Sequence, residues 1–197
     1  MVRQEKVSVA LMSLTKKKQL AFALLVFERM LPSLIAFSKG TVRDVSCYLR
    51  AREAAWAALQ NGTDSTDNQS LNEACIKNAP DTEDFSHELT SYALNAALTM
   101  SDILEFIMDS RTDHITYIST LATDSVHLYL SGLEPSIVTS PGQAEKIAAH
   151  PLMQQELRQQ EEDTRFLSRL PDHFDDQTIA ALRARAGTQL PLLPPAT

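Results

Sequence analysis

The stretch FSHELTSYALNAALTMSDILEFIMDSR, residues 85–111, is the longest uninterrupted helical pattern in the chain and also its most apolar one. One apolar row recurs at spacings of four, four, three and four, which keeps its members on one face of an α-helix: Tyr92, Ala96, Met100, Ile103 and Ile107. A second row beside it contains Leu89, Ala93, Ala97, Leu104 and Met108. Because this helix is apolar around most of its circumference, we expect other helices to cover it inside a bundle.

The length and composition of the chain favour a helical globular protein. Of its 197 residues 44% are hydrophobic, while five glycines and nine prolines are too few for a turn-rich β fold. We therefore expect an all-α, single-domain bundle of about eight helices around the central helix 85–111, covering residues 1–187. Residues 188–197 contain three prolines and are expected to form an extended C-terminal tail.

Two other segments carry specific expectations about the bundle. Proline inside a helix costs a backbone hydrogen bond, so Pro32 predicts one helix over residues 15–30 and a separate short helix over 32–39. Residues 151–170 are polar over most of their length and have only a thin apolar stripe, which predicts a helix on the outside of the bundle.

Charge and cysteine content limit the partners and the location that we expect. The net charge of -7 and the pI near 5.2 argue against nucleic-acid and anionic-membrane partners, since both attract basic surfaces. The run KKKQLAFALLVF at 16–27 imitates a signal peptide, but its apolar part is far shorter than the roughly 20 residues that span a bilayer. We expect a cytoplasmic protein in which Cys47 and Cys75 are reduced thiols in or near the core.

A pattern of spaced residues resembles a known family. The residues that carry the likeness are Phe22, Leu25, Glu28, Arg29, Met30, Pro32, Phe37, Trp56, Leu59, Asp84, Phe85, the stretch 93–102, Pro151, Gln155 and Glu156. In this pattern the chain is similar to the YjaG-like family of bacterial proteins, catalogued as a domain of unknown function (DUF416). The resemblance implies an all-helical bundle in a bacterial cytoplasm, and it implies no activity and no catalytic residues. After Gly187 the chain departs from the pattern.

An acidic line runs along the central helix and is the first candidate site. Ser91, Asn95, Asp102, Glu105 and Asp109 project within about forty degrees of one line at about 100° per residue. Asp102 and Glu105, one turn apart, could supply oxygen ligands for a divalent cation or form an acid–base pair. The alternative, which we favour at this point, is that the line is the solvent face of a helix that is otherwise buried.

Histidines supply the second candidate. Asp124 and His127 imitate half of a carboxylate di-metal site, but only one such pair is present, so we assign no metal ligands and expect no cofactor. The other histidines lie at predicted helix ends or in loops, where they more often cap carbonyl groups than bind metal: His87, His114, His150 and His173.

Four residues are predicted to have structural roles. Glu28 and Arg29 precede Pro32 and are expected to form an ion-pair network, in which Arg29 also binds backbone carbonyls freed by the proline. Trp56, the only tryptophan, is expected to anchor its helix on the central helix.

No catalytic motif is present: the chain lacks Gly-x-Ser-x-Gly, Cys-x-x-Cys, a phosphate-binding glycine loop and His-Glu-x-x-His. The leading hypothesis is therefore a non-catalytic module that binds a protein partner or a second copy of itself, with the apolar stripe of residues 151–170 as the contact surface. The alternative is a metal- or small-molecule-binding helical enzyme that uses Asn95, Asp102, Glu105 and His127.

Overall fold

The chain folds into an all-α bundle. The computed structural model describes residues 3–41, 43–62, 67–81, 83, 87–134 and 142–193, and within these ranges there are nine helices and no strands. The helices are α1 (Arg3–Ser13), α2 (Lys16–Thr41), α3 (Ser46–Asn61), α4 (Asn68–Lys77), α5 (Thr90–Asp109), α6 (Thr112–Leu133), α8 (Gln143–Ala149), α9 (Pro151–Arg169) and α10 (Asp176–Thr188). The all-α prediction is confirmed, with one helix more in these ranges than the eight or so expected.

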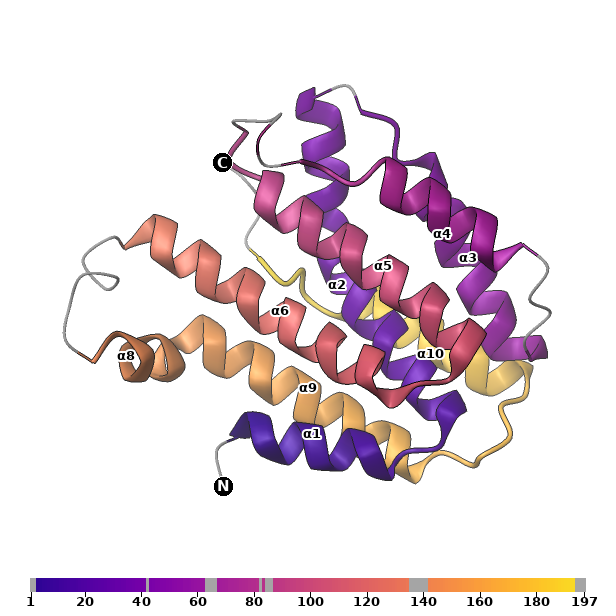
Figure 1. Ribbon diagram of the computed structural model, residues 1–197. Coiled ribbons are helices and arrows are strands. Elements are labelled where there is room, and N and C mark those ends of the chain that lie inside the picture. Colours follow the sequence, from indigo (N-terminus) through magenta and orange to yellow (C-terminus); the bar gives the residue numbers. More distant parts are fainter. Residues whose placement is uncertain are drawn as a thin grey trace.

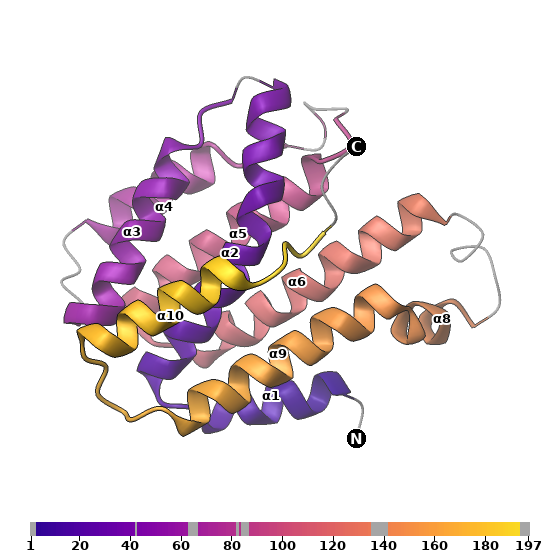
Figure 2. The same cartoon turned by 180° about the vertical axis from the view of Figure 1, so that it is seen from behind.

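Two helices, α2 and α5, form the centre and pack on each other (Figure 1). Helices α3 and α4 lie on one side of this pair, and α6, α9 and α1 lie on the other. Seen from behind, α10 lies in front of α2 and crosses it (Figure 2), and the two helices are in contact. Every residue of α2 from 18 to 27 is buried, so α2 is covered on all sides over that length and is as central as the predicted helix α5.

The central helix α5 is shorter than the predicted range 85–111. Residues 85 and 86 lie outside the described part of the chain, and the helix begins only at Thr90, whose backbone nitrogen and hydroxyl both donate to the carbonyl oxygen of His87. It ends at Asp109 because Ser110 takes a left-handed conformation, with φ at 58°. Apart from Met108 and Asp109 at its end, the residues of α5 are at least partly buried, as its apolar pattern predicts.

The predicted helix break at Pro32 is wrong, because α2 continues through the proline from Lys16 to Thr41. Pro32 itself is exposed, while Leu31 and Leu34 beside it are buried. Burial of two such leucines stabilises the helix by an amount comparable to the roughly 3 kcal/mol that an internal proline costs. In the preceding turn, the carbonyl oxygen of Arg29 accepts a hydrogen bond from the backbone nitrogen of Leu192 at 2.9 Å.

The predicted outside position of residues 151–170 holds for only one face of the helix. Helix α9 packs against α1, α2 and α6, and its buried residues include the polar side chains of Glu156, Gln160 and Asp163. These polar groups are tolerated inside because each has hydrogen-bonding partners, among them Arg29 of α2. The apolar stripe of α9 is therefore used within the chain.

Helix α2 also has the length and composition of a membrane span. Its most apolar window has a mean hydropathy of 1.8, and 72% of that window is buried inside the protein. Core helices pass the same test of length and hydropathy, and the burial of α2 is what a core helix requires.

The C-terminal segment after α10 crosses α2 (Figure 2). Leu192 and Leu193 are buried, and Gln189 donates to Asp163 at 2.7 Å. Within the predicted tail, Thr188 thus ends α10 and residues 189, 192 and 193 pack on the helical body, while residues 194–197 lie outside the described part of the chain. The division at residue 187 stays a prediction.

Two helical glycines provide a matched stability prediction. A Cβ atom at Gly40 would lie 2.6 Å from Nε2 of His87, a ring held by an edge contact with Phe37 and by a hydrogen bond from the Leu89 nitrogen. We expect Gly40→Ala to lower the free energy of unfolding by about 1–3 kcal/mol, measured by urea denaturation. At Gly132 a Cβ meets no atom within 4 Å, so Gly132→Ala should instead raise stability by about 0.5–1 kcal/mol. Equal effects at the two positions would contradict the packing seen at Gly40.

Candidate functional site

A tight turn between α5 and α6 builds the site. Asp109 ends α5, its carboxylate accepts from the Arg111 nitrogen at 2.8 Å, and α6 begins at Thr112. Only Ser110 and Arg111 separate the two helices, so α6 returns directly alongside α5. His114, in the first turn of α6, consequently faces the last turns of α5.

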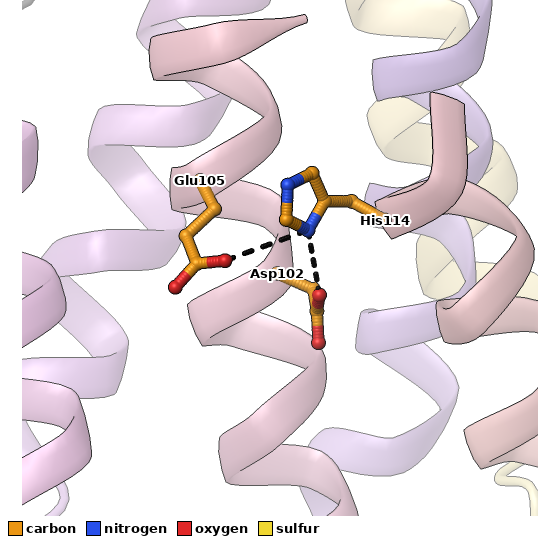
Figure 3. A group of neighbouring side chains, drawn as sticks. All are labelled: Asp102, Glu105 and His114. Carbon is orange, nitrogen blue, oxygen red and sulfur yellow. Dashed lines mark hydrogen bonds and ion pairs between the residues drawn. The ribbon is translucent and has the colours of Figure 1, made fainter. Parts of the chain in front are cut away.

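Three side chains meet at this corner (Figure 3). The Nδ1 atom of His114 lies 2.8 Å from Oδ1 of Asp102 and 3.5 Å from Oε2 of Glu105. One potential ligand atom from each of the three residues falls within 4.8 Å of the others. We call this set, Asp102, Glu105 and His114, the acid–histidine cluster.

Outer polar groups hold the cluster in place. The second ring nitrogen of His114, Nε2, lies 3.2 Å from Oδ2 of Asp109. The amide of Asn72 on α4 donates to Oε1 of Glu105 at 3.4 Å, and the Ser101 hydroxyl donates to that amide's oxygen at 2.6 Å. Ligand side chains that are oriented by such outer hydrogen bonds are typical of protein metal sites.

The surroundings of the cluster raise the pKa values of both Asp102 and His114. Burial raises the pKa of Asp102, and this outweighs the hydrogen bond with His114 that favours its ionised form. For His114, burial alone would lower the pKa, but hydrogen bonds to Asp102 and Asp109 and their negative charges outweigh it and raise the pKa above 6.5. Three carboxylates surround the one imidazole ring, so the negative charge of this corner attracts a cation.

The raised pKa of His114 predicts a pH-dependent contribution to the free energy of unfolding. Protonated His114 is stabilised in the folded state, so this contribution is complete below about pH 6.5 and is lost as pH rises through the folded-state pKa. We therefore expect the stability difference between the wild type and His114→Gln to shrink from pH 6 to pH 8.5, measured by urea denaturation in EDTA. His127→Gln, an exposed site on the same helix, is the control, and a difference that grows with pH would refute the assignment.

The structure brings together some of the predicted site residues and separates others. Asp102 and Glu105 share the acid–histidine cluster, half-buried against α6, and do not form a plain solvent face. Asn95 lies two turns earlier on α5, where its buried amide donates to Ser125 at 2.9 Å. His127 is exposed and lies 13 residues beyond His114 on α6, about 20 Å along the helix. Neither Asn95 nor His127 is part of the cluster.

Sequence reasoning set aside His114, the residue that joins the cluster together. The available signal was the short turn: two antiparallel helices joined by two residues place the first turn of one beside the last turns of the other. Asn72 had no signal, since it comes from α4, which is distant in sequence.

Three of the four predicted structural residues, Glu28, Arg29 and Trp56, lie in two polar networks. Buried Arg29 contacts Glu156 and Asp163, both at 2.9 Å, and also donates to the Leu25 carbonyl at 3.2 Å. Glu28 accepts from Arg52 at 2.6 Å and from the indole nitrogen of Trp56 at 2.9 Å. The hydrogen bonds of Trp56 and Arg52 to Glu28 thus tie α3 to α2.

The fold and the cluster together define an all-α bundle with a polar acid–histidine corner, and the comparisons agree on the fold. The chain belongs to the family described as "Protein of unknown function (DUF416)", whose family model matches residues 6–189. It is similar to a solved structure of a DUF416 family protein from Shewanella baltica OS155, with 22% identity and a TM-score of 0.82 over 91% of this chain and 92% of the other. No curated protein matches the chain.

Proposed function

We propose that this protein binds a divalent metal ion through Asp102, Glu105 and His114. The observation that carries the proposal is the approach of three donor atoms, one imidazole nitrogen and two carboxylate oxygens, to within 4.8 Å of one another. Ligand atoms arranged tetrahedrally around a zinc ion are about 3.4 Å apart, as follows from metal–ligand distances of about 2.1 Å. The separations of 2.8 Å and 3.5 Å from Nδ1 of His114 bracket that spacing.

The chemistry of the donors selects the class of ion. A mixed nitrogen and oxygen set suits Zn²⁺, Mn²⁺ or Fe²⁺, whereas Ca²⁺ and Mg²⁺ prefer oxygen ligands alone. Without metal, a proton lies between Nδ1 of His114 and Asp102, and a bound cation would replace it. Asp109 on the opposite ring nitrogen would orient the imidazole and increase its basicity.

Calorimetric titration of EDTA-stripped protein with Zn²⁺, Mn²⁺ and Mg²⁺ tests the proposal. We expect one Zn²⁺ or Mn²⁺ per chain, weaker binding of Mg²⁺, and a rise in melting temperature with the tighter ions. Asp109→Asn removes only the outer partner of His114 and should weaken binding by about 10–100-fold. His114→Ala should weaken it further.

His127→Ala is the matched control, because it removes an exposed histidine from the same helix outside the cluster. It should leave the affinity unchanged. Equal affinities of the wild type and a folded His114→Ala variant, or the absence of any binding, would refute the proposal.

Binding of a protein partner or of a second copy of the chain, the leading hypothesis from the sequence, needs a different surface from the one predicted. Of the apolar residues that were expected to meet a partner, Met153 and Leu157 are buried within the chain, and Leu152, Phe166 and Leu170 are partly buried against its core. A protein partner, self-association and a cytoplasmic location stay predictions. The metal-binding alternative has the more specific support, although the residues differ from those expected, with His114 in place of Asn95 and His127.

A further inference from the structure

The two cysteines of the chain meet in its interior. Cys47 lies on α3 and Cys75 on α4, with exposed fractions of only 4% and 1%. The two helices pack side by side (Figure 1). The packing of α3 on α4 thus brings together the chain's only two thiols, which are far apart in the sequence.

Contacts around the two residues place the thiol groups against each other. The Cys47 and Cys75 side chains share a hydrogen bond. Next to Cys47, the hydroxyl of Tyr48 donates to the backbone oxygen of Cys75 at 2.8 Å, which fixes the first turn of α3 against the last turn of α4. The approach of the thiols is therefore held by the fold.

The environments of the two thiols are unequal. Cys47 is the second residue of α3, where the helix dipole favours a thiolate. The hydrogen bond from Cys75 lowers the pKa of Cys47, against the opposing effects of burial and of the Asp44 charge. The same contact and burial raise the pKa of Cys75, against the charge of Arg50. Cys47, at the start of α3, is therefore favoured as the thiolate, whereas Cys75 lies in the last turn of α4, where the helix dipole disfavours negative charge.

We propose that Cys47 and Cys75 are an oxidisable dithiol that hydrogen peroxide converts to an internal disulfide between α3 and α4. The Cys47 thiolate attacks one peroxide oxygen, which forms a sulfenic acid and releases hydroxide. The Cys75 sulfur then attacks the sulfenic sulfur, its proton joins the departing hydroxyl, and water leaves. Overall, two thiols and one peroxide give one disulfide and two waters, with sulfur oxidised and peroxide oxygen reduced.

The disulfide would change the protein as well as record its oxidation. It would join two helices that are otherwise held by packing and by the Tyr48 hydrogen bond. Closing the chain between these residues restricts the unfolded state, so the oxidised form should melt at a higher temperature than the reduced form. Reversible disulfides of this kind in reducing compartments are typically redox-sensing or catalytic.

Intact-mass measurement of the full-length reduced protein, treated with hydrogen peroxide in EDTA, tests the proposal. We expect the mass to fall by a pair of hydrogen atoms, free thiols to disappear, and a peptide map to link Cys47 with Cys75. Dithiothreitol should restore the starting mass. In the Cys75→Ser variant no disulfide can close, so Cys47 should stop at a sulfenic acid that dimedone captures.

Cys47→Ser is the complementary variant, because it removes the proposed nucleophile. It leaves only the less acidic Cys75 thiol and should yield no dimedone adduct. If either serine variant fails to fold, titration of the wild type with glutathione disulfide replaces it and should give the same linked peptide. Two thiols that stay free in the folded wild type, or oxidation to sulfinic acid without a linked peptide, would overturn the proposal.

Discussion

Replacement of Arg29 by methionine is expected to lower the free energy of unfolding by about 3–5 kcal/mol, because two buried carboxylates lose their shared cation. The guanidinium group is 3% exposed and contacts Glu156 and Asp163, which are 4% and 0% exposed. Burial by itself lowers the pKa of Arg29, but attraction to these two carboxylates outweighs it and raises the pKa. Asp163 keeps a second cation, Arg185 at 2.7 Å, whereas within the described part of the chain Glu156 is ion-paired with Arg29 alone.

Urea denaturation with a second substitution separates lost charge pairing from lost packing. In the wild-type background Glu156→Gln should destabilise the protein, since it removes a charge that Arg29 pairs with. In the Arg29→Met background the same change should stabilise it, since it removes an unpaired buried charge. Arg111→Met breaks an exposed ion pair with Asp113 and should have little effect. A loss of less than about 1 kcal/mol for Arg29→Met would contradict this account.

Trp56→Ala is expected to cost about 3–5 kcal/mol, the second large effect, because it leaves a cavity between helices and removes a hydrogen bond. The side chain is 1% exposed, its indole nitrogen donates to Glu28 at 2.9 Å, and Arg183 of α10 lies 4.9 Å from the ring centre. One residue thus joins α3 to both α2 and α10.

Thermal and urea unfolding of three variants tests the role of Trp56. Trp56→Phe keeps an aromatic ring but loses the donor to Glu28. Its free energy of unfolding should therefore lie between those of the wild type and Trp56→Ala. Leu49→Ala, on the same helix but 38% exposed, should change stability by less than about 0.5 kcal/mol. A Trp56→Ala variant as stable as Leu49→Ala would contradict the packing described.

The helical class could be predicted from the sequence because periodicity reports burial directly. The two rows of apolar residues on α5 correctly indicated a helix covered on several sides. The break at Pro32 was predicted wrongly because the cost of a proline inside a helix is outweighed by the burial of α2 residues before and after it. The polar residues of α9 were assigned to the surface because sequence does not show that Glu156 and Asp163 have Arg29 as a partner.

The candidate site was predicted in part for similar reasons. Asp102 and Glu105 were found because they lie one turn apart on one helix, a relation that spacing reveals. His114 and Asn72 come from other helices, and their approach depends on the turn after α5 and on the packing of α4. His127 matched a spacing pattern with Asp124, but both side chains are exposed.

Anomalous X-ray diffraction from crystals of this protein grown with Zn²⁺, recorded at the zinc edge, tests the central claim most directly. We predict one strong anomalous peak within coordination distance of Nδ1 of His114, with Asp102 and Glu105 oxygens as the other protein ligands. A crystal that shows no peak at this corner, or one that shows zinc only at exposed histidines such as His127, would contradict the claim.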